Sequence, residues 1–475
     1  MRESVIHSTE NNNLYLYDAQ HKFSVLMHPD LGKVHEKSIG TDSYYVNKYT
    51  YLKKYGFFGK SEPVDFETIL DEAIIKEKII QIQRLVFEVT DHCNLNCMYC
   101  RTSGKLYKFG RKKKDRKKNI SIRYAVNLLK YIFDLKLKNK SRELHISFYG
   151  GEPLVKIQLI KQIVETAYQL NSGKELELGF AMTTNATLIH QHIHFLVEHN
   201  FQLLISLDGD EEGQSYRTFA KDNKNSFRQV IENIDMIQRD FPAYFAEHVD
   251  FNAVLHNRNS VKSIYEFVYN RYHKIPKISQ LNRGEKNSTQ KDLFERMFVN
   301  KRKSEEEYLN KASDLVPGTR EELIFYKELG YFIKDYSINF HALNLLFLLY
   351  GNSKRFPTGT CVPFSKKMFL STCHNLLPCE KIINKYSLGK VNENVIIDIP
   401  EIARKFNVYY EHFKKICQHC YSCRSCGVCL LTIEDLDKLD TEEFVCFGFQ
   451  NQEAFKKKLN RMLSKLEKEP NLFFK

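Results

Sequence analysis

Three cysteines form the most chemically distinctive group in the sequence. They lie in the stretch EVTDHCNLNCMYC (88–100) at Cys93, Cys97 and Cys100, directly after a run of strand-forming residues. Three thiols cannot all pair into disulfides, and they are one short of the Cys₄ set of a structural zinc site. Three thiolates on a tight loop can instead hold three irons of a [4Fe–4S] cluster and leave the fourth iron open to another ligand. Incidental cysteines, or a fourth ligand from a distant part of the chain, are the alternatives.

A second group of cysteines lies near the C-terminal end of the chain, whereas residues 1–92 and 101–360 contain none. Repeated C-x₂-C steps indicate metal sites when thiols stay reduced, and both zinc and iron–sulfur clusters use such steps. The nine members are Cys361, Cys373, Cys379, Cys417, Cys420, Cys423, Cys426, Cys429 and Cys446.

The cellular compartment bears on whether these thiols are reduced. The first residues, MRESVIHSTENNN, lack the apolar segment of a signal peptide. The most apolar run, 338–350, is too short to cross a bilayer. We therefore expect a cytoplasmic protein with no membrane partner, in which clustered cysteines bind metal.

The net charge of +13 is concentrated in two segments. Residues 101–118 contain ten Lys or Arg and one Asp, and residues 451–475 contain seven basic and three acidic residues. The rest of the chain balances, so the charge pattern does not favour a nucleic-acid-binding surface. The run 111–118 is typical of a solvated loop, and guidance of an acidic peptide is the functional alternative.

The middle of the chain alternates between strand-like and helix-like periods. The apolar positions of 122–138 follow a helical period behind Ser121, a candidate N-cap. Alternation of this kind predicts an α/β fold with a parallel sheet, either open or closed as a barrel. The expected strands are 85–89, 144–150, 176–184, 203–209 and 249–256, and the expected helices are 122–138, 154–170, 187–199, 226–239 and 260–270.

Polar or glycine residues follow each of the first four expected strands. The three cysteines come after the first strand, and Gly150, Gly151 and Glu152 after the second. Asn185 comes after the third, and Ser206 and Asp208 after the fourth. Because the carboxyl ends of parallel strands meet at one edge, these residues should lie together at a site.

The flanking regions are less distinctive. Residues 1–80 predict a separate α+β unit with short β-like runs, LYLYDA, FSVLMH and SYYVNKY, and then a helix near 65–82. Residues 276–355 predict a charged, mostly helical insertion, 356–450 a cysteine-rich module, and 451–475 a basic helix or tail.

The cysteine loop and the strand ends of 84–270 resemble the radical S-adenosylmethionine (radical SAM) enzymes. The resemblance implies a partial (β/α)₆ barrel over 81–275 and a [4Fe–4S] cluster that binds S-adenosylmethionine through its open iron. It places Tyr99 beside adenine, and Gly150, Gly151 and Glu152 at the methionine ammonium. It also implies ribose and carboxylate contacts by Asn185, Ser206 and Asp208, and pairing of Arg217 with the methionine carboxylate.

The C-terminal cysteines resemble a SPASM module, which carries auxiliary [4Fe–4S] clusters. The resemblance assigns Cys361, Cys379 and Cys429, with Cys373 as the nearest fourth candidate, to one cluster. It assigns Cys417, Cys420, Cys426 and Cys446 to the second. The spacing of Cys426 and Cys429 departs from the pattern, as does His374 in place of a glycine. Which of Cys373 and Cys423 is not a ligand stays open.

The whole chain is similar to bacterial radical SAM peptide maturases. This implies a small ribosomal precursor peptide as substrate, a flavodoxin- or ferredoxin-like electron donor, and precursor recognition by residues 1–80. An anaerobic sulfatase-type maturase that forms formylglycine is the alternative within enzymes. A zinc-dependent nucleic-acid-binding protein is the alternative of another class, and the open three-cysteine site disfavours it.

Overall fold

The computed structural model describes residues 2–37, 42–100, 106–107, 118–139, 143–173, 176–283, 287–311, 315–339, 355–433, 436–441 and 444–470. The chain forms two compact units. The sheet unit consists of Asp71–Ile324 and Cys361–Ala403, and the terminal unit of Met1–Leu70, Phe325–Thr360 and Arg404–Lys475. The C-terminal cysteines are therefore divided, with Cys361, Cys373 and Cys379 in the sheet unit and the others in the terminal unit.

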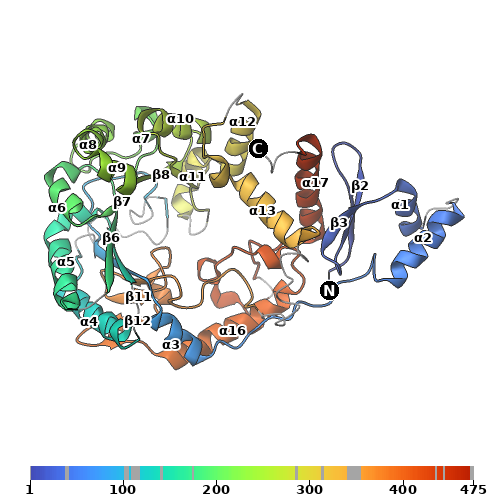
Figure 1. Ribbon diagram of the computed structural model, residues 1–475, viewed down its shortest axis with the longest axis horizontal. Helices are drawn as coiled ribbons and strands as arrows, with labels where there is room; N and C mark the ends of the chain where they lie inside the picture. The colour runs from blue at the N-terminus through green and yellow to red at the C-terminus, as the bar shows by residue number, and fades with distance from the viewer. Residues whose placement is uncertain are drawn as a thin grey trace. The chain divides into compact units, whose positions relative to one another are not determined.

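The core of the sheet unit is a ten-stranded sheet. Six of its strands are parallel and follow one another in chain order, and Figure 1 shows the connecting helices on the outer side of the curved sheet. This arrangement confirms the predicted α/β fold with a partial (β/α)₆ barrel. The six strands are β4 (Arg84–Thr90), β5 (Glu143–Gly150), β6 (Glu177–Thr184), β7 (Gln202–Ser206), β8 (Val249–Leu255) and β9 (Lys277–Gln280).

The connecting helices bury one apolar face each. In α4 (Ile122–Lys138), Ala125, Leu128, Leu129, Ile132 and Phe133 are buried, as the helical period predicted. Ser121 occupies the N-cap position, but its side chain makes no capping bond. The other helices of this layer are α5 (Ile157–Asn171), α6 (Ile193–Glu198), α7 (Glu211–Gln214), α8 (Phe227–Asp240), α9 (Pro242–His248) and α10 (Val261–Tyr272), and α3 (Glu72–Ile80) precedes the sheet.

Four short strands from the cysteine-rich region extend the sheet beyond β4. β10 (Met368–Leu370) pairs parallel to β4, with Phe369 opposite Val86. The next three strands pair antiparallel in sequence order, which makes the sheet mixed. Strands of two or three residues carry no readable period, so the sequence did not reveal them. They are β11 (Asn375–Leu377), β12 (Gly389–Val391) and β13 (Val395–Ile396).

The predicted insertion is mostly helical where the structure describes it. It contains α11 (Lys291–Met297), α12 (Lys301–Lys311) and α13 (Ile324–Tyr336), but it begins with β9, the sixth parallel strand. The apolar run 338–350 lies mostly outside the described residues. Among the helices of the described ranges, none combines the length and apolar character needed to cross a bilayer.

The terminal unit joins the beginning and the end of the chain. Its antiparallel sheet has the order β1 (Val5–Ser8), β2 (Leu14–Asp18), β3 (Phe23–Leu26). The C-terminal helix α17 (Gln452–Lys468) packs beside β1 (Figure 1). Tyr17, Tyr336 and Phe455 meet in one apolar cluster. Most of α16 (Ile399–Cys417) also belongs to this unit, as do α1 (Pro29–His35) and α2 (Ser43–Lys54).

The predicted β-like run SYYVNKY is wrong, because these residues form the start of α2. The Asp42 side chain accepts a hydrogen bond from the backbone N–H of Tyr44 and caps the helix. Tyr45, Tyr49 and Leu52 then fall on one helical face and pack on the cluster of Leu16, Met27 and Leu31. Tertiary packing therefore overrides the strand preference of tyrosine and valine.

Candidate active site

The loop after β4 carries the three cysteines and is fixed by backbone pairing. The N–H of Asn96 donates to the Thr218 carbonyl at 2.7 Å, and the N–H of Met98 donates to the Tyr216 carbonyl at 3.0 Å. The segment that contains Arg217 therefore lies directly against the cysteine loop. The sequence predicted that both segments contribute to one site, and the structure brings them together.

Burial makes the thiolate form of Cys93 and Cys97 costly. Burial raises the pKa of Cys93 well above its usual value, and it raises the pKa of Cys97 to about 12 although Arg217 opposes the shift. A thiolate in such a place needs a cation close by. Iron bound directly to sulfur supplies that charge, so the donor set fits a cluster with three protein ligands.

Gly150 and Gly151 let the loop after β5 approach the cysteine loop. A Cβ on Gly151 would lie 2.2 Å from the His92 carbonyl oxygen, and one on Gly150 would lie 2.3 Å from that of Thr90. Gly150 also has a φ of 154°, in the region that favours glycine. The N–H of Gly151 donates to the Thr90 carbonyl at 2.7 Å. In the structure, this glycine pair allows two backbone loops to pack closely.

Glu152 connects the ends of two strands from a buried position. Its carboxylate accepts the Asn185 N–H at 2.7 Å, the Thr184 hydroxyl at 2.8 Å and the Leu154 N–H at 3.1 Å. Burial raises the pKa of Glu152 to about 7, and these three donors oppose the shift. Glu152 thus orders the backbone beside the cysteine loop, and the predicted contact with a ligand ammonium stays a prediction.

Asn185 touches the cysteine loop itself. Its side-chain amide Nδ2 lies 3.7 Å from Cys93 Sγ and donates to Asn94 Oδ1 at 2.9 Å. Ser206, at the end of β7, lies opposite Asn252 of β8 in the register of the sheet. Both predicted residues therefore stand at the carboxyl edge of the parallel strands, as the sequence indicated.

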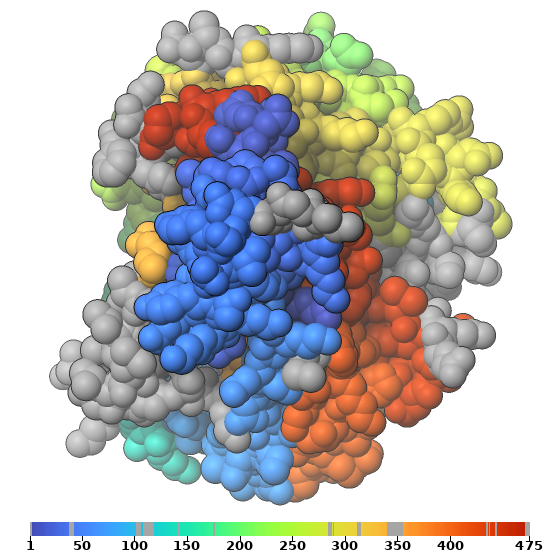
Figure 2. All heavy atoms as spheres, turned by 90° about the vertical axis from the view of Figure 1, so that its right-hand side faces the viewer, coloured from blue at the N-terminus to red at the C-terminus, as the bar shows by residue number. Residues whose placement is uncertain are grey.

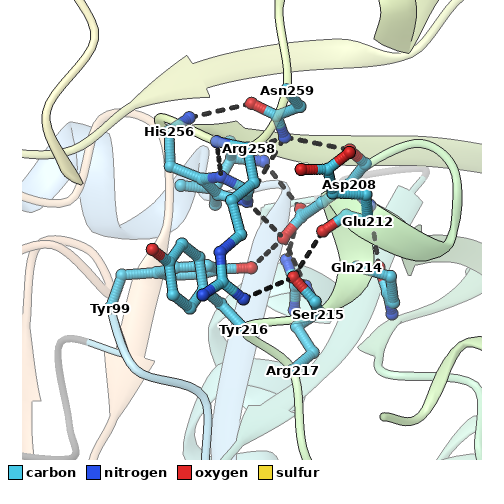
Figure 3. Close-up of polar contacts among 12 residues, drawn as sticks. Tyr99, Asp208, Glu212, Gln214, Ser215, Tyr216, Arg217, His256, Arg258 and Asn259 are labelled. Carbon is cyan, nitrogen blue, oxygen red and sulfur yellow. Dashed lines mark hydrogen bonds and ion pairs between the residues drawn. The ribbon is translucent and has the colours of Figure 1, made fainter.

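Asp208, Arg217 and Tyr99 form one buried network, shown in Figure 3. Arg217 Nε donates to Asp208 Oδ2 at 2.9 Å, and Arg217 Nη2 donates to Oδ1 at 3.0 Å. The Tyr99 hydroxyl also donates to Oδ2, and the Val254 N–H donates to Oδ1 at 2.8 Å. Burial would raise the pKa of Asp208, but Arg217 overrides it and holds that pKa well below its usual range.

These four donors fill the acceptor positions of the Asp208 carboxylate, which number about four. The main chain of Asp208 is bonded as well, since its N–H donates to Gln214 Oε1 and its carbonyl accepts from Asn259 Nδ2. The predicted contacts of Asp208 and Arg217 with a bound nucleotide stay predictions. What the structure describes is an internal ion pair that holds Tyr99 in place.

His256 is a member of this network that sequence reasoning missed. Its imidazole is fully buried, lies 3.8 Å from Asp208 Oδ2 and stacks on the Tyr99 ring with centroids 5.6 Å apart (Figure 3). In the sequence, His256 was distinguished only by its position as the last residue of the expected strand 249–256. A histidine at a strand end beside other strand-end polar residues was the available signal.

Three cysteines of the terminal unit, Cys417, Cys420 and Cys446, receive backbone N–H groups. The Gln450 N–H donates to Cys420 Sγ at 3.4 Å. Burial raises the pKa of Cys417 and of Cys446, and backbone N–H groups of Thr358 and Gly448 respectively lower it. Such donors stabilise negatively charged sulfur, and they suit thiolate ligands of a cluster.

In the sheet unit, His374 adopts the conformation expected of the glycine that it replaces. Its φ is 63°, in the left-handed region. Its imidazole Nε2 accepts the Ser121 N–H at 3.2 Å, at the start of α4. The histidine therefore keeps the turn between β10 and β11 next to Cys373. The shared ligand set of Cys361, Cys373, Cys379 and Cys429 stays a prediction.

The position of the predicted basic loop is only partly described. Residues 111–117 of the predicted basic loop lie outside the described residues.

In the described ranges, no three His, Cys, Asp or Glu side chains surround a single metal ion. A four-iron cluster binds each thiolate through a different iron, so its cysteine ligands need not surround a single point.

The radical SAM superfamily profile matches residues 87–268, which span β4 to α10. The chain contains a radical SAM domain. The match covers the cysteine loop, the glycine pair, Asn185 and the Asp208–Arg217 pair, and thus the whole network at the carboxyl edge of the strands.

Two curated relatives are similar in sequence to this chain. The radical SAM cyclopropyl synthase TigE of Paramaledivibacter caminithermalis is 25% identical over 179 residues, 37% of this chain and 36% of that protein. The cysteine-type anaerobic sulfatase-maturating enzyme of Clostridium novyi is 23% identical over 335 residues, 67% of this chain and 79% of the enzyme. The chain thus spans about a third of the length of the first relative.

Solved structures extend the likeness beyond the radical SAM domain. The structure of anSMEcpe with bound AdoMet has a TM-score of 0.53 at 17% identity and covers 82% of this chain and 98% of its own. The same protein with AdoMet and the Cp18Cys peptide also has a TM-score of 0.53 at 17% identity and covers 82% of this chain and 99% of its own. This likeness shows a shared fold that includes regions outside residues 87–268.

Proposed function

We propose that this chain is a radical SAM peptide maturase. The observation that carries the proposal is the convergence of the Cys93–Cys100 loop, the Asn185 amide and the Tyr99–Asp208–Arg217 network at one edge of the sheet. Cys93, Cys97 and Cys100 would hold a [4Fe–4S] cluster, and Tyr99, Gly150, Asn185, Ser206 and Arg217 would border S-adenosylmethionine. When bound, these groups supply a 5′-deoxyadenosyl radical that removes a hydrogen atom from a peptide side chain.

The protein residues would position the reactants and exclude water. Tyr99 and His256 form a stacked, buried wall beside the cysteine loop. α11 covers this wall, since Phe294 and Met297 pack in one apolar cluster with Tyr99. A dry, aromatic-lined site suits radical chemistry, because it protects a reactive intermediate from solvent.

A ribosomal precursor peptide is the proposed substrate, and the terminal unit would bind its leader. β3 is an edge strand, and Val25 and Leu26 on it are 37% and 64% exposed. The nearby α2 has no buried residue and lies at the surface (Figure 2, blue). Tyr44 and Tyr51 on α2, and Tyr55 at its C-terminal end, are exposed. An extended peptide can add to such an edge through main-chain hydrogen bonds while its side chains contact the aromatic helix.

A sulfatase-type maturase is the second candidate. Its support is the relative of that name, which aligns with 67% of this chain. Both candidates act on peptides, and the proposed electron donor is a flavodoxin- or ferredoxin-like protein in either case. The hypothesis of a zinc-dependent nucleic-acid-binding protein has no support comparable to the radical SAM profile match.

The test begins with anaerobically reconstituted protein. The wild type should be brown and should cleave S-adenosylmethionine to 5′-deoxyadenosine under reducing conditions. Changing Cys93, Cys97 and Cys100 to Ala should abolish that cleavage and leave the C-terminal iron in place. A variant that still forms 5′-deoxyadenosine at the wild-type rate would refute the proposal.

The same preparation can separate the two candidates. Incubation with a sulfatase-derived peptide, and separately with short peptides encoded beside the gene, should be followed by mass spectrometry. We expect a mass change only in a neighbouring peptide. Conversion of the sulfatase peptide to formylglycine would favour the second candidate instead.

A further inference from the structure

Arg2 is buried against the loop of the terminal unit that contains Cys423. Only 6% of the residue is exposed. Its Nη1 donates to Cys423 Sγ at 3.2 Å. Its backbone is fixed by Ser61, whose N–H donates to the Arg2 carbonyl at 2.8 Å. The guanidinium is therefore held in place from both ends of the side chain.

Cys423 differs from the neighbouring cysteines in what it binds. Cys417, Cys420 and Cys446 receive backbone N–H groups. The sulfur of Cys423 instead receives a side-chain guanidinium. Burial raises the pKa of Cys423, and Arg2, Arg424 and Arg355 lower it. Its thiol is thus already engaged by protein cations.

A second polar group of Arg2 points to a missing acceptor. Within the described residues, Arg2 Nε is buried and finds no hydrogen-bond partner. Buried N–H groups in folded proteins are normally bonded, so each exception calls for an explanation. The sulfurs of a cluster bound by the adjacent cysteines are acceptors of suitable charge.

Other contacts tie cations and the N-terminal segment to the same loop. Arg355 Nη1 donates to the carbonyl of Arg424, the residue after Cys423. The Tyr421 hydroxyl donates to the Glu3 carbonyl at 3.0 Å and accepts the Glu3 N–H at 2.9 Å. Asp335 is an acidic group influenced by Arg355 and Arg424, and burial raises its pKa. Arg2, Arg355 and Arg424 thus bring three cations to this loop.

We propose that Arg2 is a tuning residue that raises the reduction potential of the cluster bound by Cys417, Cys420, Cys426 and Cys446, and that Cys423 positions Arg2 and does not ligate iron. Four thiolates give the cluster site a net negative charge, and reduction adds one more negative charge. A buried guanidinium stabilises the more negative state, and hydrogen bonds to sulfur act in the same direction. The proposal rests on the proposed function only for the presence of this cluster.

The experiment uses the full chain with Cys93, Cys97 and Cys100 changed to Ala, so that only the auxiliary iron remains. The iron content decides the role of Cys423. Cys423→Ala should keep the iron of the parent protein, whereas Cys420→Ala should lose up to about four irons per chain, one cluster's worth. Loss of a comparable amount in Cys423→Ala would make Cys423 a ligand and overturn that part of the proposal.

The role of Arg2 is decided by redox titration monitored by electron paramagnetic resonance. Arg2→Gln should shift one auxiliary potential to a more negative value, and Arg2→Lys should restore part of the shift because it keeps the charge. Arg461→Gln is the matched control, since it removes an arginine that pairs with Glu328. Its potential should equal that of the parent.

Each remaining outcome has a definite meaning. Equal potentials in Arg2→Gln and the parent would overturn the tuning role. If Arg2→Gln fails to fold, Arg2→Lys alone still tests the hydrogen bond through its change in potential and signal shape. A parent protein without auxiliary iron would refute the cluster assignment itself, and it would leave S-adenosylmethionine cleavage by the wild type as a separate result.

Discussion

The Arg217 guanidinium and the Asp208 carboxylate form a two-bond ion pair, in which the side chains of both residues are less than a tenth exposed. The two residues are nine positions apart in sequence and lie on either side of α7. Their pairing fixes the hydroxyl of Tyr99 and the segment that binds the cysteine loop. The pair thus acts on the site through its neighbours.

Breaking this pair should destabilise the fold as well as the site. Asp208→Asn leaves Arg217 buried without a counter-charge, and removal of one partner from a buried pair costs about 3–5 kcal/mol. We expect a lower urea midpoint and loss of S-adenosylmethionine cleavage. Asp240→Asn breaks an exposed pair with Arg239 and should change neither quantity. Similar midpoints for the two variants would show that the buried pair is dispensable.

Stability should fall as the pH rises from about 4.5 to about 7, because of Glu152. Its pKa is raised from 4.5 to about 7 by burial, so in that window the folded state holds a proton that the unfolded state has lost. The effect approaches roughly 3 kcal/mol. Urea unfolding at several pH values should show it without added S-adenosylmethionine. Glu152→Gln should flatten the dependence, and an unchanged slope would assign it to other groups.

Gly151→Ala should disrupt the site more than its small size suggests. The new Cβ would meet the His92 carbonyl oxygen at 2.2 Å, which forces the two loops apart. We expect reduced iron at the three-cysteine site and at least a tenfold loss of S-adenosylmethionine cleavage. Gly330→Ala in α13 is the control, because nothing lies within 4 Å of its Cβ. That variant should be neutral, or stabilised by up to about 1 kcal/mol.

Charge on the edge of β3 should impair peptide processing selectively. Leu26→Asp places a carboxylate where the proposed leader would pair, so the KM for the precursor should rise severalfold. Cleavage of S-adenosylmethionine without peptide should not change. Exposed Val408 on α16 offers a control position, Val408→Asp. Equal KM values for Leu26→Asp and the wild type would remove the leader-binding role from this edge.

Truncation is a poorer test of the same role. β1 packs beside α17, and Arg2 and Glu3 bond to the loop of Cys423. Deletion of residues 1–80 would therefore expose the core of the terminal unit and disturb its cysteines. Single substitutions on the exposed edge avoid this effect.

The sequence by itself determined the chemistry of the core. The spacing of Cys93, Cys97 and Cys100, the glycine pair and the polar strand ends are local features, and the alternating periods are local too. Because strand and helix patterns repeat over a few residues, they predicted five of the six parallel strands. The sixth strand, β9, lies in the region that was predicted to be a helical insertion. Parallel pairing then required Asn185, Ser206 and Asp208 to share one edge.

Only the tertiary structure decided which distant residues meet. β10 joins β4 from nearly 300 residues away, and a three-residue strand has no periodic signal of its own. The SYYVNKY run became helical because Tyr45 and Tyr49 gained an apolar surface to pack on. His256 beside Asp208, and Arg2 on Cys423, depend on backbone positions set by the whole fold. Contacts of this kind arise from packing between segments, which no local pattern encodes.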